Sequence, residues 1–199
     1  MTDDKFTSIG ITGNIGSGKS YVSKIISLFQ IPVFDCDMEA KALYSDCNEL
    51  KRIMVGRYGD DIYGKDGNID KGKLSEIIFQ NKDELTFINS IVHPMVEKKC
   101  IDWMYDMKSC GYSKVLVECA IMFETNIHRI VDKIILVDAS DEIRIQRAMK
   151  RDGSTYEKVI SRMQRQLSHE ELKNKSDFLI DNSGENLLLP QITLILESP

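Results

Sequence analysis

Hydrophobic and polar residues follow two different periods in turn along this chain, and these periods predict strands that alternate with helices. Several short apolar runs have the length and composition of strands buried on both faces of a sheet. These runs are residues 8–12, 32–35, 114–118, 133–137 and 178–180. Parallel strands need crossover connections, which are usually helices. The alternation therefore predicts an α/β fold of three layers with a parallel five-stranded sheet.

Helical periodicity appears between several of these runs. After the first run, apolar residues recur at i, i+3, i+4 and i+7, which is one face of a helix. The residues of this face are Val22, Ile25, Ile26 and Phe29. The pattern predicts helices at 19–29, 141–150 and 156–167, and another near the C-terminus. Pro190 leaves the start of that last helix undefined, because proline is disfavoured in helix interiors.

The segment from about 38 to 107 has a different pattern, without a strong strand. It is typical of several helices separated by turns. The turn signals are Gly56, Gly59-Asp60, Gly64, Gly67-Asn68 and His93-Pro94. A helical insertion between the second and third strands is the simplest interpretation. We expect such an insertion to cover a second substrate.

A glycine-rich loop follows the first strand. Residues 13–20 match G-x-x-x-x-G-K-[ST], the phosphate-binding P-loop, in its expected place between a strand and a helix. Glycines let backbone N–H groups approach phosphates, and the helix that follows adds the positive end of its dipole. Lys19 is placed to reach the β- and γ-phosphates, and the Ser20 hydroxyl to ligate Mg²⁺. The flanking elements favour a nucleoside-triphosphate site over an ordinary Gly/Ser-rich turn.

Two carboxylates end the second strand, at the sheet edge where ligands of α/β folds bind. Alternation along an extended chain would put Asp35 and Asp37 on the same side. One could position Mg²⁺ or its waters, and the other could accept a proton from an attacking hydroxyl. The alternative is a pair of helix N-cap aspartates.

Two further residues have a functional and a structural interpretation, and both stay open. Glu118 ends the third strand, where a carboxylate could orient metal-bound water or cap the next element. His93 precedes Pro94, a pair that also suits a structural turn.

A basic stripe is expected on one helix face, although the protein is acidic. Arg144, Arg147 and Arg151 fall at i, i+3 and i+7, and Arg162 and Arg165 follow on the next helix. Guanidinium groups bind phosphate bidentately and stabilise charge on a transferred phosphoryl group. The alternative is a solvated face that pairs with nearby acids. Gly153-Ser154-Thr155 could serve as a hinge of a mobile lid.

Composition restricts the function further. The chain has 199 residues and a net charge of −5, which suits one compact domain and argues against nucleic-acid binding. Residues 1–5 are acidic and polar, so no secretory signal is expected, and no apolar run approaches the ~18 residues of a membrane span. Five cysteines without a C-x-x-C pair favour reduced thiols in a cytoplasmic protein. We expect no membrane partner and a monomer or weak homo-oligomer.

Together, these ordered motifs resemble the dephospho-CoA kinase family over nearly the whole chain. The matching segments are 10–20, 34–37, 67–74, 78–79, 93–94, 120–124, 147–152 and 180–184. The resemblance implies a P-loop kinase that transfers the ATP γ-phosphoryl group to the ribose 3′-hydroxyl of dephospho-CoA. It also implies one domain with a core of 1–37, 108–143 and 170–199. An acceptor-binding insertion at about 38–107 and a lid at about 144–169 would complete it.

The resemblance also assigns roles by position. The ATP phosphates would be lined by Gly16, Ser17, Gly18, Lys19, Ser20 and Tyr21. We expect Asn14 and Ile15 of the same loop to bind them as well. Catalysis would use Lys19, Asp37 as base, and the lid residues Arg147 and Arg151. The acceptor would contact Asp35, Lys41, His93 and Glu118, and Mg²⁺ would contact Ser20 and Asp35.

Three positions depart from the family pattern. Tyr21 replaces the usual Thr, Lys41 replaces a common Arg, and 120–124 replace Pro-Leu-Leu-x-Glu. None removes the lysine, hydroxyl or carboxylate that phosphoryl transfer needs.

Three rival classes remain at this point. A GTPase would use 61–64 as D-x-x-G, but no apolar strand precedes it, and 81–84 narrowly miss N-K-x-D. Another small-molecule kinase on the same core is the second. A nucleotide-binding regulator without turnover is the third, and the intact Lys19, Ser20 and Asp37 count against it.

Overall fold

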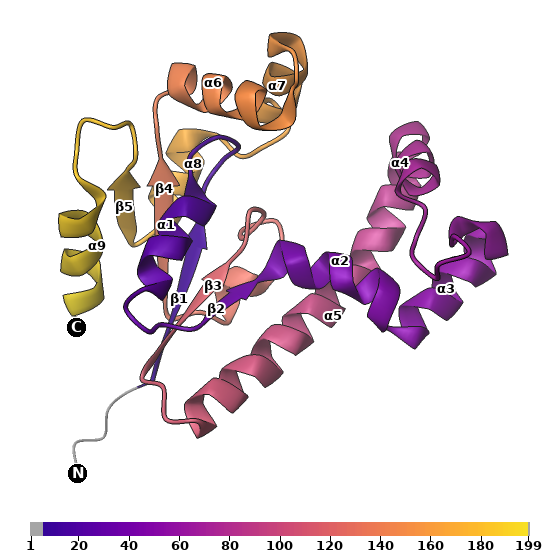
Figure 1. Cartoon of the computed structure of the whole chain (residues 1–199), viewed down its shortest axis with the longest axis horizontal. Coiled ribbons are helices and arrows are strands. Elements are labelled where there is room, and N and C mark those ends of the chain that lie inside the picture. The colour runs from indigo at the N-terminus through magenta and orange to yellow at the C-terminus, as the bar shows by residue number, and fades with distance from the viewer. Residues whose placement is uncertain (1–5, 199) are drawn as a thin grey trace. The chain divides into compact units, whose positions relative to one another are not determined.

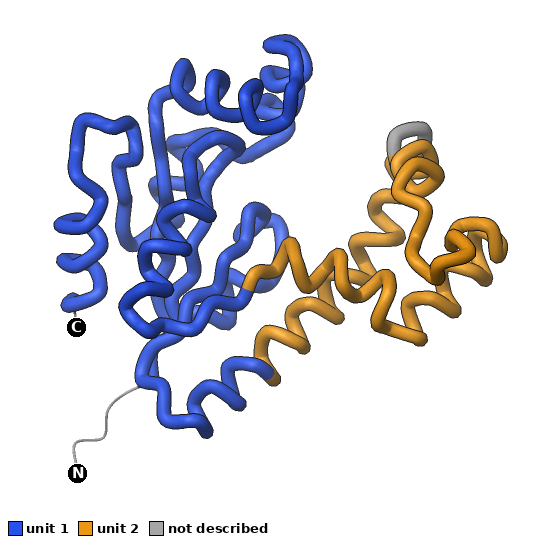
Figure 2. Tube along the Cα trace, viewed as in Figure 1, with its two compact units in different colours: residues 1–34, 103–199 blue, residues 35–102 orange. Residues whose placement is uncertain are grey.

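The computed structural model describes residues 6–198, without the side chains of Phe79 and Gln80, so the acidic start at 1–5 lies outside it. The chain divides into two compact units (Figure 2). One unit combines the residues up to Phe34 with those from Trp103 onward, and the other is Asp35–Asp102. Each unit is described below by itself.

The first unit is built around a five-stranded sheet in the order β2-β3-β1-β4-β5 (Figure 1). The strands are β1 Thr7–Thr12, β2 Val33–Asp35, β3 Lys114–Glu118, β4 Lys133–Asp138 and β5 Phe178–Asp181. The central strand β1 pairs in parallel with β3 and β4, and β4 pairs in parallel with β5. The predicted α/β fold with a parallel sheet is therefore confirmed.

Parallel pairing brings the carboxyl ends of the strands to one edge of the sheet. Ile11 is in register with Glu118 on one side and with Ile135 on the other. The loop after β1 therefore starts beside the last residue of β3. This edge is where α/β proteins place their ligands.

Two helices, α1 (Lys19–Ser27) and α9 (Leu188–Glu197), pack on one face of the sheet. Ile26 and Ile192 are fully buried there against Ile11 and Ile135. Burying side chains of this size stabilises a fold by roughly 1.5–3 kcal/mol each. This packing therefore holds α1 against the sheet.

The boundaries of three predicted helices need correction. Helix α1 ends at Ser27 instead of 29, and Phe29 lies 43% exposed beyond it. Helix α6 (Asp141–Asp152) extends to Gly153, whose positive φ of 57° ends it, and α7 (Tyr156–Met163) stops before 167. In α9, Pro190 lies in the first turn, where no N–H partner is lost.

Helix α8 (His169–Lys175) was not predicted. Its signal is the spacing S-x-x-E. Ser168 Oγ accepts from the Glu171 N–H at 3.2 Å, and the Glu171 carboxylate accepts from the Ser168 N–H at 2.9 Å. This reciprocal pair is a capping box, which starts a helix even when the apolar pattern is short. A 3₁₀ turn, η2 (Ile127–Arg129), lies between β3 and β4.

The second unit is helical, as the pattern predicts. It contains α2 Cys36–Asp46, α3 Asn48–Tyr58, the 3₁₀ turn η1 Asp60–Ile62, α4 Lys71–Gln80 and most of α5 Lys82–Ser109. No helix in the described part of the chain is both long and apolar enough to cross a membrane.

The turn signal at Gly56 is wrong, because this residue lies inside α3. The turn predicted at His93-Pro94 is also wrong. Both residues lie inside the 28-residue helix α5. Proline removes one helical hydrogen bond. However, Ile88, Val92 and Val96 follow at intervals of four residues and are buried. Packing of this face holds the helix together across the proline, because tertiary burial outweighs one lost bond.

Candidate active site

The phosphate loop has two glycines in conformations that other residues rarely adopt. Gly16 and Gly18 have φ of 78° and 89°. A Cβ on Gly16 would lie 2.1 Å from the carbonyl oxygen of Arg144, and a Cβ on Gly18 would lie 2.1 Å from Asn182 Nδ2. Both the backbone conformation and the close neighbours therefore require glycine at these two positions.

The loop lysine and hydroxyl share one carboxylate oxygen. Lys19 Nζ lies 2.7 Å from Glu118 Oε1, and Ser20 Oγ donates to the same oxygen at 2.6 Å. Lys19 is 8% exposed and Glu118 is 4% exposed. Glu118 therefore contacts the lysine and the hydroxyl of the phosphate loop. These contacts are not those of a residue that caps the next element.

Glu118 stays ionised in this setting. Burial alone would raise the pKa of its carboxyl, but the charge of Lys19 and the bonds from Lys19 and Ser20 outweigh burial and lower it. An anionic Glu118 occupies the two groups that a triphosphate and its metal need. ATP binding must therefore replace this ion pair.

Glu118→Gln is expected to reduce the free energy of unfolding at pH 7 by about 3–5 kcal/mol, because Lys19 would lose its buried counter-charge. The folded-state pKa of Glu118 is lowered, so the stability from this pair is present above the ordinary Glu pKa of about 4.3. It is lost as pH falls through the folded-state value. Urea unfolding of both proteins between pH 7 and pH 3 measures this. A gap that stays constant over this range would contradict the assignment.

The predicted basic stripe divides into groups with different partners. Arg144 is buried and bonds Asp141 at 2.8 Å, as the solvated-face alternative proposed, but it also donates to the carbonyl of Ile15 at 3.2 Å. Arg151 and Arg162 both pair with Asp152, at 2.8 and 2.7 Å.

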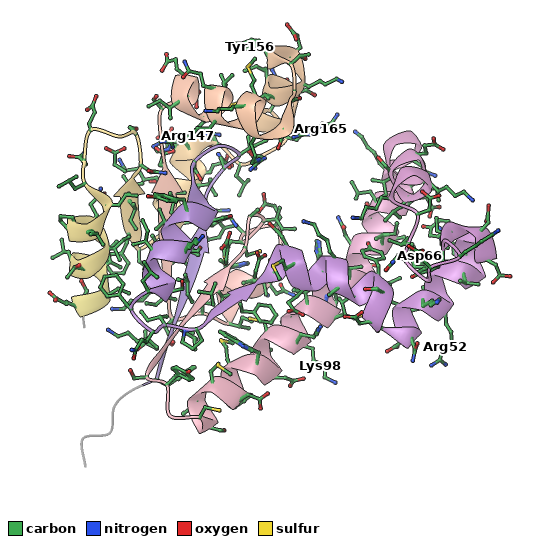
Figure 3. The ribbon with its side chains drawn as sticks, in the orientation of Figure 1. Arg52, Asp66, Lys98, Arg147, Tyr156 and Arg165 are labelled. Carbon is green, nitrogen blue, oxygen red and sulfur yellow. The ribbon has the colours of Figure 1, made fainter. Side chains whose placement is uncertain are left out.

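Arg147 differs from the other arginines between residues 144 and 165. Its Nη1 is buried and has no hydrogen-bond partner among the described residues. The same atom lies 3.8 Å from the position of a Cβ on Gly18. The side chain of Arg147 points from α6 toward the phosphate loop, whereas Tyr156 lies on the opposite side of α6 and α7 (Figure 3). An unpaired guanidinium beside this loop is suited to bind a phosphate.

Two residues that bond the backbone of the loop were not predicted from the sequence motifs. Asn182, just after β5, donates from Nδ2 to the Ser17 carbonyl at 2.7 Å, and its own N–H bonds the Asp138 carbonyl. Gln166 accepts from the N–H of Ile15 at 2.9 Å. Asn182 lies in the matching segment 180–184, which was the only sequence signal for it.

In the second unit, Asp35 caps helix α2. Its Oδ1 accepts from the N–H groups of Asp37 and Met38 at 2.9 and 3.0 Å. The expectation that both aspartates share one side of an extended chain is wrong, because the chain becomes helical at Cys36. Asp37 instead lies in the first turn of α2, where the helix dipole favours its anionic form.

The remaining predicted residues of this unit lie on helices. Lys41 follows Asp37 by one turn of α2, so the two share a helix face, and Lys41 is exposed. His93 is half-buried in α5, and burial lowers the pKa of its imidazole, which keeps the ring neutral at pH 7. Tyr21 of the first unit is 62% exposed on α1. No three carboxylate, His or Cys side chains form a metal cluster within the described residues.

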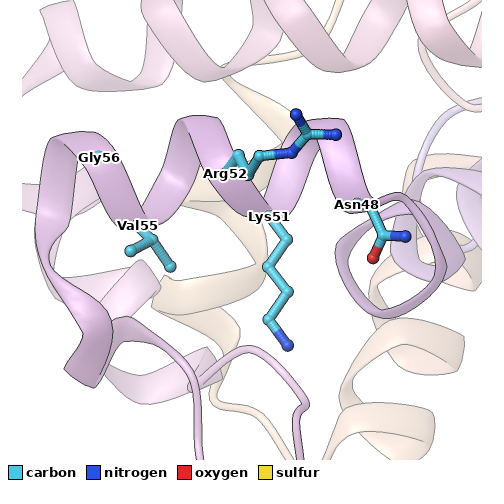
Figure 4. Close-up of a pocket in the computed structure, with 5 residues that line it drawn as sticks. All are labelled: Asn48, Lys51, Arg52, Val55 and Gly56. Atoms are coloured by element: carbon cyan, nitrogen blue, oxygen red, sulfur yellow. The ribbon is translucent and has the colours of Figure 1, made fainter.

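An open cavity of about 560 Å³ lies along one face of α3 (Figure 4). Its lining residues are Asn48, Lys51, Arg52, Val55 and Gly56. The Lys51 amine also lies 5.1 Å from the centre of the Tyr63 ring. The second unit therefore presents positive charge and some apolar surface along this helix.

Comparison with known proteins identifies the family. The model of the dephospho-CoA kinase family matches residues 7–187. A dephospho-CoA kinase from Porphyromonas gingivalis is 38% identical over 192 residues, which cover 96% of this chain and 93% of the relative. Another from Fusobacterium nucleatum is 36% identical over 177 residues, 88% of this chain and 89% of the relative.

Solved structures agree on the fold. The structure of TT1252 from Thermus thermophilus has a TM-score of 0.78 at 26% identity, covering 97% of this chain and 95% of that one. A dephospho-CoA kinase from Campylobacter jejuni has a TM-score of 0.70 at 24% identity, with 96% and 95% covered. With its intact phosphate loop and its match along almost the whole sequence, this chain belongs to the dephospho-CoA kinase family and is a kinase.

Proposed function

We propose that this protein transfers the γ-phosphoryl group of ATP to the ribose 3′-hydroxyl of dephospho-CoA, which gives coenzyme A and ADP and completes coenzyme A biosynthesis. The observation that carries the proposal is the Lys19–Glu118–Ser20 cluster beneath an intact phosphate loop, in a chain of this family. The cluster contains the lysine and the hydroxyl that phosphoryl transfer requires.

ATP would bind with its phosphates on the N–H groups of the loop. Lys19 would then exchange Glu118 for the β- and γ-phosphates, which offer more negative charge at the same place. Arg147 Nη1 has no hydrogen-bond partner among the described residues, and this guanidinium would bind the transferred group, whose charge spreads over three oxygens in a loose transition state. These contacts are stronger in the transition state than in bound ATP, so they accelerate the reaction.

Mg²⁺ fits the donor atoms beside the loop. Ser20 Oγ and the Glu118 carboxylate are hard oxygen donors 2.6 Å apart. Mg²⁺ keeps several waters and takes only one or two protein ligands besides phosphates, so a three-residue cluster is not needed. When bound, the ion would neutralise charge on the β- and γ-phosphates. Asp35 would act on its water shell, because one of its oxygens already caps α2.

The acceptor is assigned to the second unit. Asp37, at the start of α2, would orient the ribose hydroxyl and take its proton late in the transfer. Lys41 on the same helix face supplies a cation for the negatively charged acceptor. A neutral His93 can donate or accept a hydrogen bond to the acceptor without adding charge.

The decisive experiment is a coupled assay of ADP release with a panel of acceptors, followed by product analysis. Dephospho-CoA is the expected acceptor, and ³¹P NMR with mass spectrometry should find the new phosphate on the ribose 3′-oxygen. Phosphate on another oxygen, or turnover of free nucleosides but not of dephospho-CoA, would contradict the proposal. Preference for GTP over ATP would favour the GTPase-like alternative.

Arg147→Ala is expected to lower kcat by about 10²-fold and to change ATP affinity only a few-fold, because the guanidinium acts mainly on developing charge. Arg151→Ala should also slow catalysis, but less, since Asp152 already binds its guanidinium at 2.8 Å. Single-turnover kinetics and ATP titration separate the two effects. Equal losses in kcat for both variants would show that the lid rearranges to use both arginines alike.

We further propose a cytoplasmic location and a monomer or weak homo-oligomer. Five cysteines are free of disulfides, as expected for a reducing compartment. ATP and dephospho-CoA are the proposed partners, and nucleic acid is not among them, because the net charge of −5 opposes binding to a polyanion.

A further inference from the structure

The tip of the phosphate loop is held by the lid. Both polar groups of the Ile15 backbone bond side chains from the lid: the N–H donates to Gln166 Oε1 at 2.9 Å, and the carbonyl accepts from Arg144 Nε at 3.2 Å. The neighbouring Asn14 donates from Nδ2 to the Leu167 carbonyl at 3.0 Å. Three hydrogen bonds thus orient one dipeptide, and residues 144–167 supply the partner of each.

These partners lie at the two ends of the lid. Arg144 is in the first turn of α6, and Gln166 and Leu167 follow the end of α7. Both ends of the lid are therefore fastened to the same two residues of the loop. Next along the chain, His169 Nδ1 lies 3.0 Å from Asp138 Oδ2 at the end of β4, which fixes the returning segment to the sheet edge.

Gln166 and Arg144 contribute differently to this arrangement. Arg144 is buried, and its second bond to Asp141 ties it to its own helix. Gln166 is half-buried, and its side chain makes no other hydrogen bond within the described residues than the one to Ile15. A neutral side chain with one backbone contact on a ligand-binding loop is suited to set the shape of that loop.

We infer that Gln166 is a positioning residue for the nucleotide. Its bond to the Ile15 N–H holds the loop in the shape that receives the triphosphate, and it fixes the returning end of the lid beside that loop. The inference concerns nucleotide binding, so it does not depend on the identity of the acceptor. A residue with a merely structural role would affect the binding of both substrates alike.

The test uses Gln166→Met, which keeps the length of the side chain and removes the acceptor oxygen. ATP affinity, measured by calorimetry, is expected to fall about tenfold, the effect of one lost hydrogen bond to a backbone group. The affinity for dephospho-CoA is expected to stay unchanged, and the melting temperature to fall by only about 2–4 °C, the effect of one lost hydrogen bond. Gln164→Met, two residues earlier and exposed, is the matched control and should bind ATP normally.

Amide hydrogen exchange at Ile15 gives a second readout. The Ile15 N–H should exchange several-fold faster in Gln166→Met than in the native protein. Gln166→Glu keeps an acceptor oxygen and should retain the slow exchange, which separates the bond from the bulk of the side chain. ATP affinity within twofold of native in Gln166→Met, or equal losses for ATP and dephospho-CoA, would overturn the inference, as would unchanged exchange at Ile15.

Discussion

Lys19→Ala is expected to lower kcat/KM by several powers of ten, about 10³–10⁵-fold, because Lys19 is the cation that the phosphate loop itself supplies to the γ-phosphate. The loss should appear mainly in kcat, since the charge on the transferred group grows toward the transition state. Steady-state kinetics with ATP and dephospho-CoA measure both constants. Near-native turnover would contradict the phosphate-loop assignment.

Stability has to be controlled in this experiment. Removing Lys19 leaves Glu118 charged and buried, a change that costs about 3–5 kcal/mol when one partner of a buried pair is lost. The double variant Lys19→Met with Glu118→Gln removes both charges and should melt close to the native protein while remaining inactive. Lys24→Ala, on the exposed side of the same helix, is the matched control and should retain full activity.

Asp37→Asn is expected to lower kcat by roughly 10²–10⁴-fold, while the affinity for ATP and Mg²⁺ changes little. Asparagine keeps the size of the side chain and removes the basic oxygen. A ribose hydroxyl holds its proton tightly at neutral pH, so the reaction needs a carboxylate to orient it and to accept the proton late. Single-turnover kinetics at saturating ATP measure the chemical step.

Asp35→Asn is the comparison variant. Asparagine is as good an N-cap as aspartate, so α2 should keep its start and the bond to the Asp37 N–H. This variant should raise the Mg²⁺ concentration needed for half-maximal rate. If Asp37→Asn instead stays within a few-fold of native kcat, Asp37 is not the base, and a structural role at the start of α2 is preferred.

Short-range spacing was enough to predict the sheet and the phosphate loop. The five strands lie within one residue of their predicted ranges, because buried parallel strands are short apolar runs with little ambiguity. The loop motif needs only eight consecutive residues, and two of its three glycines, Gly16 and Gly18, have positive φ.

Local signals misled where distant packing decided the outcome. The His93-Pro94 pair indicates a turn, but burial of one face carries α5 through it. Asp35 and Asp37 alternate as in a strand, yet α2 begins between them, because Asp35 caps it. At His93-Pro94 the backbone follows contacts that the neighbouring residues do not reveal, whereas the cap made by Asp35 is local and was one of the two interpretations of the sequence.

By itself, the sequence determined the class of fold, the phosphate loop and the family, since each depends on the order and spacing of nearby residues or on a match along the chain. Only the tertiary structure decided which charged groups meet. Lys19 and Glu118 are 99 residues apart, and Ile15 and Gln166 are 151 apart, so their contacts exist only once the strands and lid are assembled. The same holds for the arginines of the lid. These arginines share one helix face by their spacing, yet their partners differ. Asp152 binds Arg151, whereas Arg147 Nη1 lies beside Gly18 without a hydrogen-bond partner among the described residues.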